Sequence, residues 1–400
     1  MIRITTANAF DNSVRTLQER AREVSTAQSR LTSGKRISQA SDDPTAAARV
    51  ERALAAQARS EADQRGLEAS RNAMQQTEGA LGQADDLMQL ARELVVQAGN
   101  GSYSDAERAN LGQRLRGVRD QLLAVANRGD GAGGHLFGGQ GAAQPPFVDA
   151  AGGVQYRGQG GQMKVVAGEP LPMTQDGAET WLQAPSGNGA FETAPAAGNS
   201  AGAWIDAGRL TDPAALTGAN YQVVFGASAG AMSYSVLKNG AATALANQPY
   251  VAAQAIEFDG MAVAVNGSPA AGDAFDVKPA TPSLSVFAAL DRAASALTTP
   301  YRSGAQVAQT VHFGLRDIDA SLGRLQSRRA DAGETLNRTD AIEQRLSAAS
   351  VAAQSERSLA EDLDMVAGVS AFQNKQTGYD AALKTYAMVQ RLSLFQYLNV

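Results

Sequence analysis

Long helical heptads at both ends of this 400-residue chain, on either side of a glycine-rich middle, constrain its fold most strongly. The clearest heptad spaces five apolar residues by seven: Leu67, Met74, Leu81, Met88 and Val95. A second seam of small residues has the same spacing: Ser70, Thr77, Ala84, Ala91 and Ala98. Such a stripe needs another helix along it. The pattern predicts a helical hairpin with both termini at one end, which is typical of an assembly subunit.

Further stripes extend this predicted rod. Ser104 and Glu107 have the spacing of a capping box and precede a helix that carries Leu111, Leu115 and Leu122. After the glycine-rich middle, Leu322 and Leu325 resume a helical spacing. We expect these residues to form the rod core together with the five members of the first heptad.

An acidic pair precedes the second predicted helix. The first helix ends at Ser33-Gly34-Lys35, where glycine suits a helix C-terminus, and the second opens at Ser41-Asp42-Asp43-Pro44. Proline lacks the amide hydrogen that a first turn leaves unpaired, and either carboxylate can cap the helix and oppose its dipole. The alternative, an acid–base pair or a metal site, lacks a nearby partner. We therefore interpret this segment as a cap.

The middle of the chain favours a β domain. Between residues 169 and 280 apolar residues alternate in short runs, and Asp259-Gly260 has the signature of a two-residue hairpin turn. The stretch from Ala184 to Gly202 is rich in Ala, Gly, Ser and Pro and is predicted to be a surface loop. The glycines of 129–134 follow a helix instead of a strand, so we interpret them as a turn and not as a dinucleotide site.

Composition excludes several classes of function. The net charge of -5 and the lack of a basic block argue against nucleic-acid and membrane partners. There is no cysteine, and only His135 and His312 could offer imidazole, which excludes disulfides, thiolate zinc sites, thiol nucleophiles and a histidine-rich metal site. The N-terminus lacks the pattern of a secretory signal, which predicts either a cytosolic protein or export without a cleavable signal.

The terminal helices are the predicted assembly interface. Each carries an apolar stripe too narrow to be stable alone in water, so we expect them to be loose in the monomer and to order on assembly. The predicted interface residues are Val14, Leu17, Val24, Leu31, Val369, Phe372, Tyr379, Leu383, Tyr386, Leu394 and Phe395. The fold class is then mainly α with an inserted β domain (α+β). Its expected parts are a terminal domain (1–40 with 362–400), a rod (41–168 with 281–361) and an outward β domain (169–280).

Two segments resemble a known family. Leu31-Thr32-Ser33-Gly34-Lys35-Arg36-Ile37 with Ser41-Asp42-Asp43-Pro44-Thr45-Ala46-Ala47 is similar to the N-terminal segment of bacterial flagellins and their junction relatives. The ending from Gln390 to Leu398 resembles the hook-associated protein 3 subfamily. The resemblance covers roughly residues 1–168 and 284–400 and leaves the β insertion unassigned.

That resemblance implies a structural, non-enzymatic subunit of the bacterial flagellum, with no catalytic residue, metal or cofactor, in a helical tubular homo-oligomer at the hook–filament junction. Its implied partners are hook-associated protein 1, flagellin, a cytoplasmic export chaperone at the C-terminal helix and the flagellar type III export apparatus. Its implied location is extracellular. Two alternatives stay open: flagellin itself, and a binding module displayed by the insertion 169–280.

Overall fold

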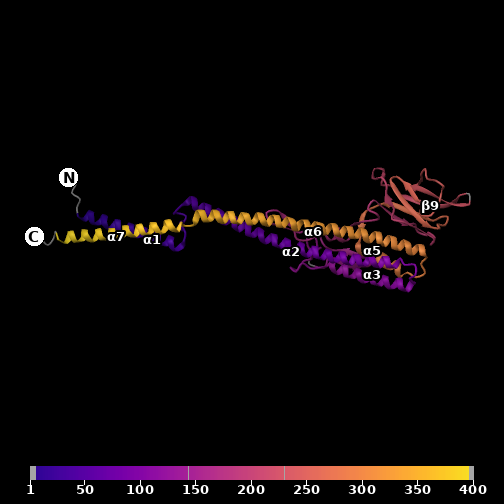
Figure 1. Cartoon of the computed structure of the whole chain (residues 1–400), viewed down its shortest axis with the longest axis horizontal. Coiled ribbons are helices and arrows are strands. Elements are labelled where there is room, and N and C mark those ends of the chain that lie inside the picture. Colours follow the sequence, from indigo (N-terminus) through magenta and orange to yellow (C-terminus); the bar gives the residue numbers. More distant parts are fainter. Residues whose placement is uncertain (1–5, 143, 229, 396–400) are drawn as a thin grey trace. The chain divides into compact units, whose positions relative to one another are not determined.

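The structure is a computed structural model that describes residues 6–142, 144–228 and 230–395. It is mainly helical with a separate β domain, which confirms the predicted fold class (Figure 1). The chain divides into two compact units: residues up to Gln64 with those from Glu343 form the first, and Arg65–Ile342 the second. The three-part division drawn from the sequence, with its breaks after residues 40, 168 and 280, stays a prediction.

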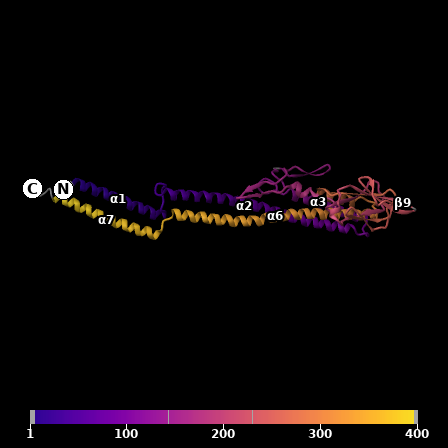
Figure 2. The ribbon, with the colours of Figure 1, turned by 90° about the horizontal axis from the view of Figure 1, so that it is seen from above.

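The first unit is built from helices alone in the described residues. It contains α1 (Thr6–Ser33), the start of α2 (Pro44–Ala98), the end of α6 (Gly304–Glu361) and α7 (Met365–Phe395). In Figures 1 and 2, α1 and α7 lie side by side and antiparallel. Gly34 adopts the left-handed backbone (φ +68°), so the predicted end of the first helix is confirmed.

The C-terminal helical pattern is interrupted more sharply than the sequence suggested. The helical spacing of apolar residues in this stretch shifts register near Val366, and there α6 ends at Glu361 and α7 begins at Met365. Asp364 accepts hydrogen bonds from the amides of Val366 (3.0 Å) and Ala367 (3.1 Å) and thereby caps α7. The local acceptor side chain thus starts a new helix at the register shift.

The second unit has a helical core made by α2, α3 (Asp105–Ala126), α5 (Val286–Thr298) and α6. At the start of α3, Ser104 accepts from the amide of Glu107 (3.3 Å), and the Glu107 carboxylate accepts from the Ser104 amide (2.7 Å). The predicted capping box is therefore confirmed. Asn127 ends this helix, and the glycines that follow form a loop in which Asp130 accepts from the Gly134 amide.

Short strand pairs flank this helical core. An aromatic cluster of Phe137, Phe147, Trp181 and Phe287 packs the first of these strands against α5, with Trp181 stacked on Phe287 at 5.8 Å between ring centroids. The pairs are β1 (Phe147–Ala150) with β2 (Gly153–Tyr156), β3 (Lys164–Val166) with β4 (Pro170–Pro172), and β5 (Ala184–Pro185) with β16 (Pro282–Leu284); α4 spans Gly177–Trp181.

The β domain consists of two antiparallel sheets around one apolar core. One sheet has the order β11-β10-β9-β15-β6, with β12 on β10, and the other has β13-β14-β7, with β8 on β14. The bounds are β6 Phe191–Pro195, β7 Ala203–Ile205, β8 Arg209–Leu210, β9 Tyr221–Ser228, β10 Ala231–Lys238, β11 Ala241–Ala242, β12 Gln248–Pro249, β13 Ala255–Phe258, β14 Met261–Gly267 and β15 Ala274–Pro279, with a 3-10 turn η1 at Pro213–Ala215.

Two features of this domain test the sequence predictions in opposite directions. Phe258 pairs with Met261 around Asp259 and Gly260, both at positive φ, which confirms the two-residue hairpin. The predicted surface loop from Ala184 to Gly202 is wrong, because this stretch contains β5 and β6 and buries Phe191 and Thr193 completely. Its small residues fit close strand packing, and composition alone cannot distinguish that from a loop.

Candidate assembly surfaces

The rod-core residues predicted from the heptads lie within the second unit and are all at most 6% exposed. The small-residue seam from Ser70 to Ala98 is buried as well. Ser70 donates to the carbonyl of Pro172 (2.7 Å) and Thr77 to that of Ala73 (2.8 Å), so both buried hydroxyls are satisfied. The ten residues are Leu67, Met74, Leu81, Met88, Val95, Leu111, Leu115, Leu122, Leu322 and Leu325. The second unit therefore closes its own helical core.

The seam of the terminal helices is only half covered. On α1 the predicted residues Val14, Leu17, Val24 and Leu31 are each partly buried. On α7, Phe372, Tyr379 and Tyr386 are partly buried in the same way, whereas Val369 is 42% and Leu383 39% exposed. The side chains of Leu394 and Phe395 lie outside the described part of the structure. Thus α1 and α7 cover one flank of a shared stripe and leave the other flank in water.

Few side chains of the first unit are buried, and most of those that are buried are small. Among its described side chains, Ile37 is the one large apolar residue in the buried class. Burying a Leu or Phe side chain contributes about 1.5–3 kcal/mol, whereas ordering each residue costs about 1–2 kcal/mol of backbone entropy. The other buried members are Ala27, Ala46, Ala53, Ser60, Ala353 and Ala360. This unit therefore gains little apolar burial from its internal packing.

Other apolar side chains of this unit are exposed, and the heptad analysis did not select them as interface residues. Leu359 near the end of α6 is 83% exposed, and Val366 at the start of α7 is 80% exposed. Val351, Met365 and Met388 are also at least half exposed. A contiguous apolar patch marks an interaction site, whereas single exposed apolar residues are common on protein surfaces.

A short pairing of backbone segments ties the two helix breaks of the first unit together. The amide of Leu363 donates to the carbonyl of Gly34 (2.9 Å), and that of Arg36 donates to the carbonyl of Glu361 (2.7 Å). Lys35 forms an ion pair with the Glu361 carboxylate. The Arg36 guanidinium also donates to the Ala360 carbonyl (2.8 Å). The breaks in the N-terminal and C-terminal helices are therefore held side by side.

The four cap residues divide into two functions. Asp43 accepts from the amides of Thr45 (3.1 Å) and Ala46 (3.0 Å) at the start of α2, where Pro44 is the first residue. Hydrogen bonds from the Ala46 amide and then the Thr45 hydroxyl hold the pKa of the Asp43 carboxyl below its usual value.

Asp42 closes the preceding turn instead. It accepts from the amides of Ser38 (3.0 Å) and Gln39 (3.1 Å), and these bonds lower the pKa of its carboxyl. Ser41 lies in the same turn, which connects α1 to α2. Asp42 thus stabilises the turn before α2, and Asp43 caps the helix itself.

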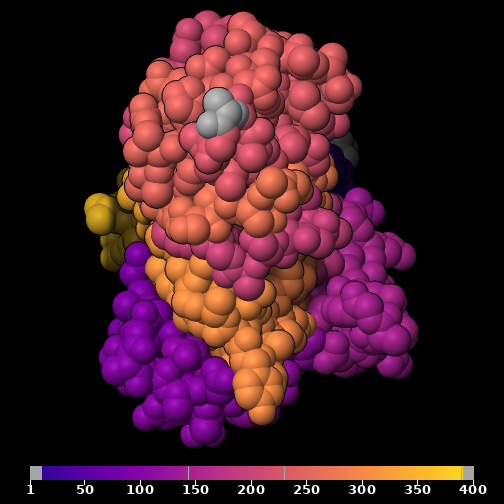
Figure 3. Space-filling model, turned by 90° about the vertical axis from the view of Figure 1, so that its right-hand side faces the viewer, coloured from indigo at the N-terminus to yellow at the C-terminus, as the bar shows by residue number. Residues whose placement is uncertain are grey.

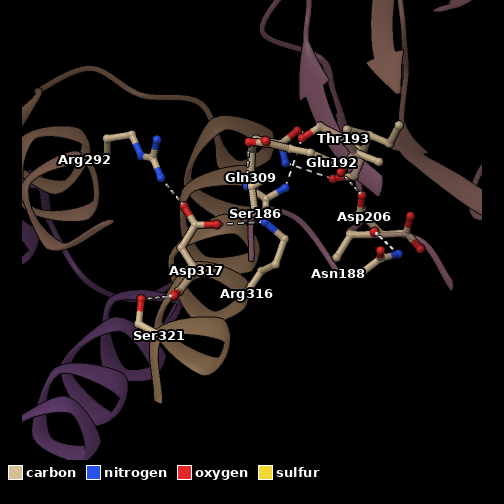
Figure 4. A network of polar contacts seen from close by, with 12 residues as sticks. Ser186, Asn188, Glu192, Thr193, Asp206, Arg292, Gln309, Arg316, Asp317 and Ser321 are labelled. Atoms are coloured by element: carbon tan, nitrogen blue, oxygen red, sulfur yellow. Dashed lines mark hydrogen bonds and ion pairs between the residues drawn. The ribbon is translucent and has the colours of Figure 1, made fainter. Parts of the chain in front are cut away.

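Polar contacts attach the β domain to the helices of the second unit (Figure 4). Arg316 on α6 donates to the carbonyl of Thr193 in β6 (3.1 Å) and lies 2.9 Å from the Asp317 carboxylate. The side-chain amide of Gln309 on α6 bonds to the backbone of Ile205 in β7 twice: its oxygen accepts from the Ile205 amide (3.0 Å), and its nitrogen donates to the Ile205 carbonyl (2.8 Å). In Figure 3 the salmon surface of the β domain lies directly against the orange helical surface. These anchors carry no sequence pattern, because their partners are backbone atoms.

Two side-chain stacks complete this attachment. The Trp204 ring of β7 stacks on the His312 imidazole of α6 with 4.2 Å between centroids. The Arg316 guanidinium lies 4.2 Å from the centre of the Phe313 ring. His312 is thereby part of a packed contact surface.

The described residues offer no cluster of three or more His, Cys, Asp or Glu side chains that could hold a metal ion. Within the same residues, no helix has the length and apolarity required to span a membrane.

The chain matches two families of domains. Residues 4–142 match the bacterial flagellin N-terminal helical region, and residues 195–279 match the D2-like domain of flagellar hook-associated protein 1. These two matches cover the N-terminal helices and most of the β domain.

Individual relatives extend the likeness. Flagellar hook-associated protein 3 of Escherichia coli is 26% identical over 370 residues, which cover 92% of this chain and 90% of that protein. The protein of the same name in Salmonella typhimurium is 37% identical over 123 residues, 31% of this chain and 39% of that protein. The crystal structure of the flagellar junction protein FlgL from Legionella pneumophila matches with a TM-score of 0.65 at 28% identity, over 70% of this chain and 95% of that one.

A closed helical core, a half-covered terminal seam and an inserted β domain define a structural protein of the flagellin type. By these matches the chain is similar to the flagellin superfamily, whose N-terminal helical region corresponds to residues 4–142. Within it, the chain is similar to flagellar hook-associated protein 3.

Proposed function

We propose that the chain is a structural subunit of the bacterial flagellum and acts as the adapter between hook-associated protein 1 and flagellin at the hook–filament junction. The observation that carries this proposal is the likeness to hook-associated protein 3 along 92% of the chain. The half-covered seam on α1 and α7 supports it, because an adapter must be completed by its neighbours.

The terminal helices form the interface of the assembly. In a head-to-tail contact whose rotation does not close, each subunit covers the exposed flank of the next and a helical tube results. Residues 1–40 and 362–400 line the inside of that tube, residues 41–168 and 281–361 form the rod, and residues 169–280 project outward. Neighbours supply the burial that Leu383 and Val369 lack in the single chain.

Export precedes this assembly. The chain passes unfolded through the flagellar type III apparatus, with a cytoplasmic chaperone on the C-terminal helix, and it functions outside the cell without catalytic activity. The small buried set of the first unit supports this order of events, since helices with little internal packing unfold easily.

Two other functions are less well supported. Flagellin would make its own long filament, but the flagellin match covers residues 4–142 alone. A displayed binding module would place a ligand site in the insertion, whereas residues 195–279 are similar to a domain of another hook-associated structural protein.

Electron microscopy of the purified chain under conditions that polymerise flagellin separates the first two functions. The adapter should form short zones on hook-associated protein 1 and none alone. Long filaments made by the chain alone would identify it as flagellin. Screening the β domain of the intact chain against glycans tests the binding module, and we expect no binding.

A further inference from the structure

A cavity of about 300 Å³ lies in the second unit where β6 meets α5 and α6. Its apolar wall comes from Ala293 and Ala296 on α5 and from Phe313 on α6. This volume is at the lower end of the range for small-molecule sites, and an apolar wall with a few polar groups is their usual composition. The assembly proposed above makes no use of this cavity.

Most charges that line the cavity are paired with one another (Figure 4). The Asp317 carboxylate, 6% exposed, lies 2.7 Å from Arg292 and 2.9 Å from Arg316. Arg316 also lies 3.6 Å from the Glu192 carboxylate. Two guanidinium groups and two carboxylates therefore compensate each other along one side of the cavity.

Arg302 is the third guanidinium of the lining, and it has no carboxylate within 4 Å among the described residues. Its two terminal nitrogens donate to the carbonyls of Ala296 (3.4 Å) and Gln306 (3.2 Å). The Nε atom of Arg302 is buried and has no hydrogen-bond partner among the residues that the structure describes. Burial lowers the pKa of Arg302, although an arginine stays charged.

A partly buried cation without a counter-charge is unfavourable, because it has lost part of its hydration without gaining a partner. A carboxylate is the best-matched partner for a guanidinium, since the planar fork can donate two hydrogen bonds to it. The lining thus carries one net positive charge next to an apolar wall.

We propose that this cavity binds an organic monocarboxylate with an apolar body, whose carboxylate pairs with Arg302 while its body packs on Ala293, Ala296 and Phe313. Either a free organic acid or the C-terminal end of a peptide presents this chemistry. A dianion or a phosphate fits less well, because the carboxylates of Asp317 and Glu192 also line the cavity.

Isothermal titration of the full-length monomer tests the proposal with two matched pairs of probes. The first pair is 3-phenylpropionate and 3-phenylpropan-1-ol, and the second is acetyl-Gly-Phe with a free carboxylate and with a carboxamide. The acids should bind saturably with one site per chain, and each neutral analogue should bind about tenfold more weakly, as expected for loss of a charge-assisted hydrogen bond.

Variants locate the binding site. Arg302→Met should weaken the acids about tenfold and Arg302→Lys should weaken them less, since it keeps the charge. Arg114→Met, an exposed arginine of α3 outside the cavity, is the matched control and should leave affinity unchanged. Ala296→Leu fills the cavity, keeps Arg302, and should abolish binding even where Arg302→Met fails to fold.

The outcomes are distinct. Acid binding that depends on Arg302 supports the proposal, and the peptide pair then shows whether a chain end fits as well as a free acid. Absence of saturable binding, or equal affinity in Ala296→Leu and Arg114→Met, would overturn it. The filament assays above are independent of this result.

Discussion

The side-chain amide of Gln309 on α6 takes the place of a neighbouring strand for Ile205 at the edge of β7. Its Nε2 donates to the Ile205 carbonyl (2.8 Å), and its Oε1 accepts from the Ile205 amide (3.0 Å). On its other side Ile205 pairs with Val265 of β14. One helix residue therefore satisfies both backbone groups that an edge strand leaves open.

Gln309→Ala should detach the β domain from the helix at this point. Two backbone groups lose their partners, and each unsatisfied buried group costs about 1–3 kcal/mol. We expect faster hydrogen exchange at the Ile205 amide and a lower urea midpoint. Gln326→Ala, at an exposed position of the same helix, is the control. Unchanged exchange at Ile205 would show that the contact does not hold in solution.

Phe191→Ala should be severe, although the sequence suggested a tolerant loop. Phe191 is 1% exposed and belongs to the core of the β domain, and replacing a buried Phe by Ala costs about 3–5 kcal/mol. Ala197→Ser in the same stretch is exposed and should change stability by less than about 0.5 kcal/mol. Thermal unfolding followed by near-ultraviolet circular dichroism measures both. Equal melting curves for the two variants would contradict the burial of Phe191.

The helical part of this fold was predictable because its signal repeats. Five residues at spacing seven from Leu67 to Val95 specify a buried stripe, and Ser104 with Glu107 specifies where a helix begins. The stretch around Phe191 was not predictable, because glycine and alanine are common both in loops and in closely packed strands. The break before Met365 was not predictable either. A continuous helix whose heptad shifts register has the same spacing of apolar residues as a helix that ends and begins again with a new cap.

The contact surfaces were predictable in part. Leu383 and Val369 were selected by their spacing, and the structure adds that they are half exposed. Gln309, Arg316 and Arg302 were invisible to pattern analysis, since their partners are backbone carbonyls or an open cavity. Polar contacts of this kind depend on which segments meet in space, and no local spacing encodes that.

The Asp43 cap should make the start of α2 sensitive to acid. Its folded carboxyl has a pKa below the usual value, because the Ala46 amide and the Thr45 hydroxyl donate to it. The folded state therefore binds this proton less readily than the unfolded chain, whose aspartates titrate near pH 3.9. The stabilisation is present above about pH 4 and is lost as the pH falls through the folded pKa.

Asp43→Asn tests this sign. The wild type should protect the Ala46 amide from exchange better than the variant at pH 6, and the difference should shrink as the pH falls below the unfolded value and disappear below the folded pKa of Asp43. Asp86→Asn, an exposed carboxylate inside α2, is the control and should show no such difference at the Ala46 amide. A gap between wild type and Asp43→Asn that persists in acid would refute the cap.

Amide exchange in a verified monomer should divide along the two units. We expect rapid exchange in α1 and α7, whose described side chains include Ala27 as the one buried apolar residue, and slow exchange in α3 and α5. After polymerisation the terminal helices should become protected. Strong protection of residues 6–33 already in the monomer would mean that the seam is closed without neighbours.

Leu383→Asp should block incorporation into the flagellum while leaving the chain folded. In the single chain Leu383 is 39% exposed, so the carboxylate stays hydrated, but in the assembly a neighbour would bury it at a cost of several kcal/mol. Leu17→Asp on the facing helix should act in the same way. Ser370→Asp places the same charge at an exposed position of α7 away from the apolar stripe and is the matched control. Motility of each variant in a strain lacking the native gene is the measurement. A fully motile Leu383→Asp strain, with the chain detected in its filaments, would remove this leucine from the interface.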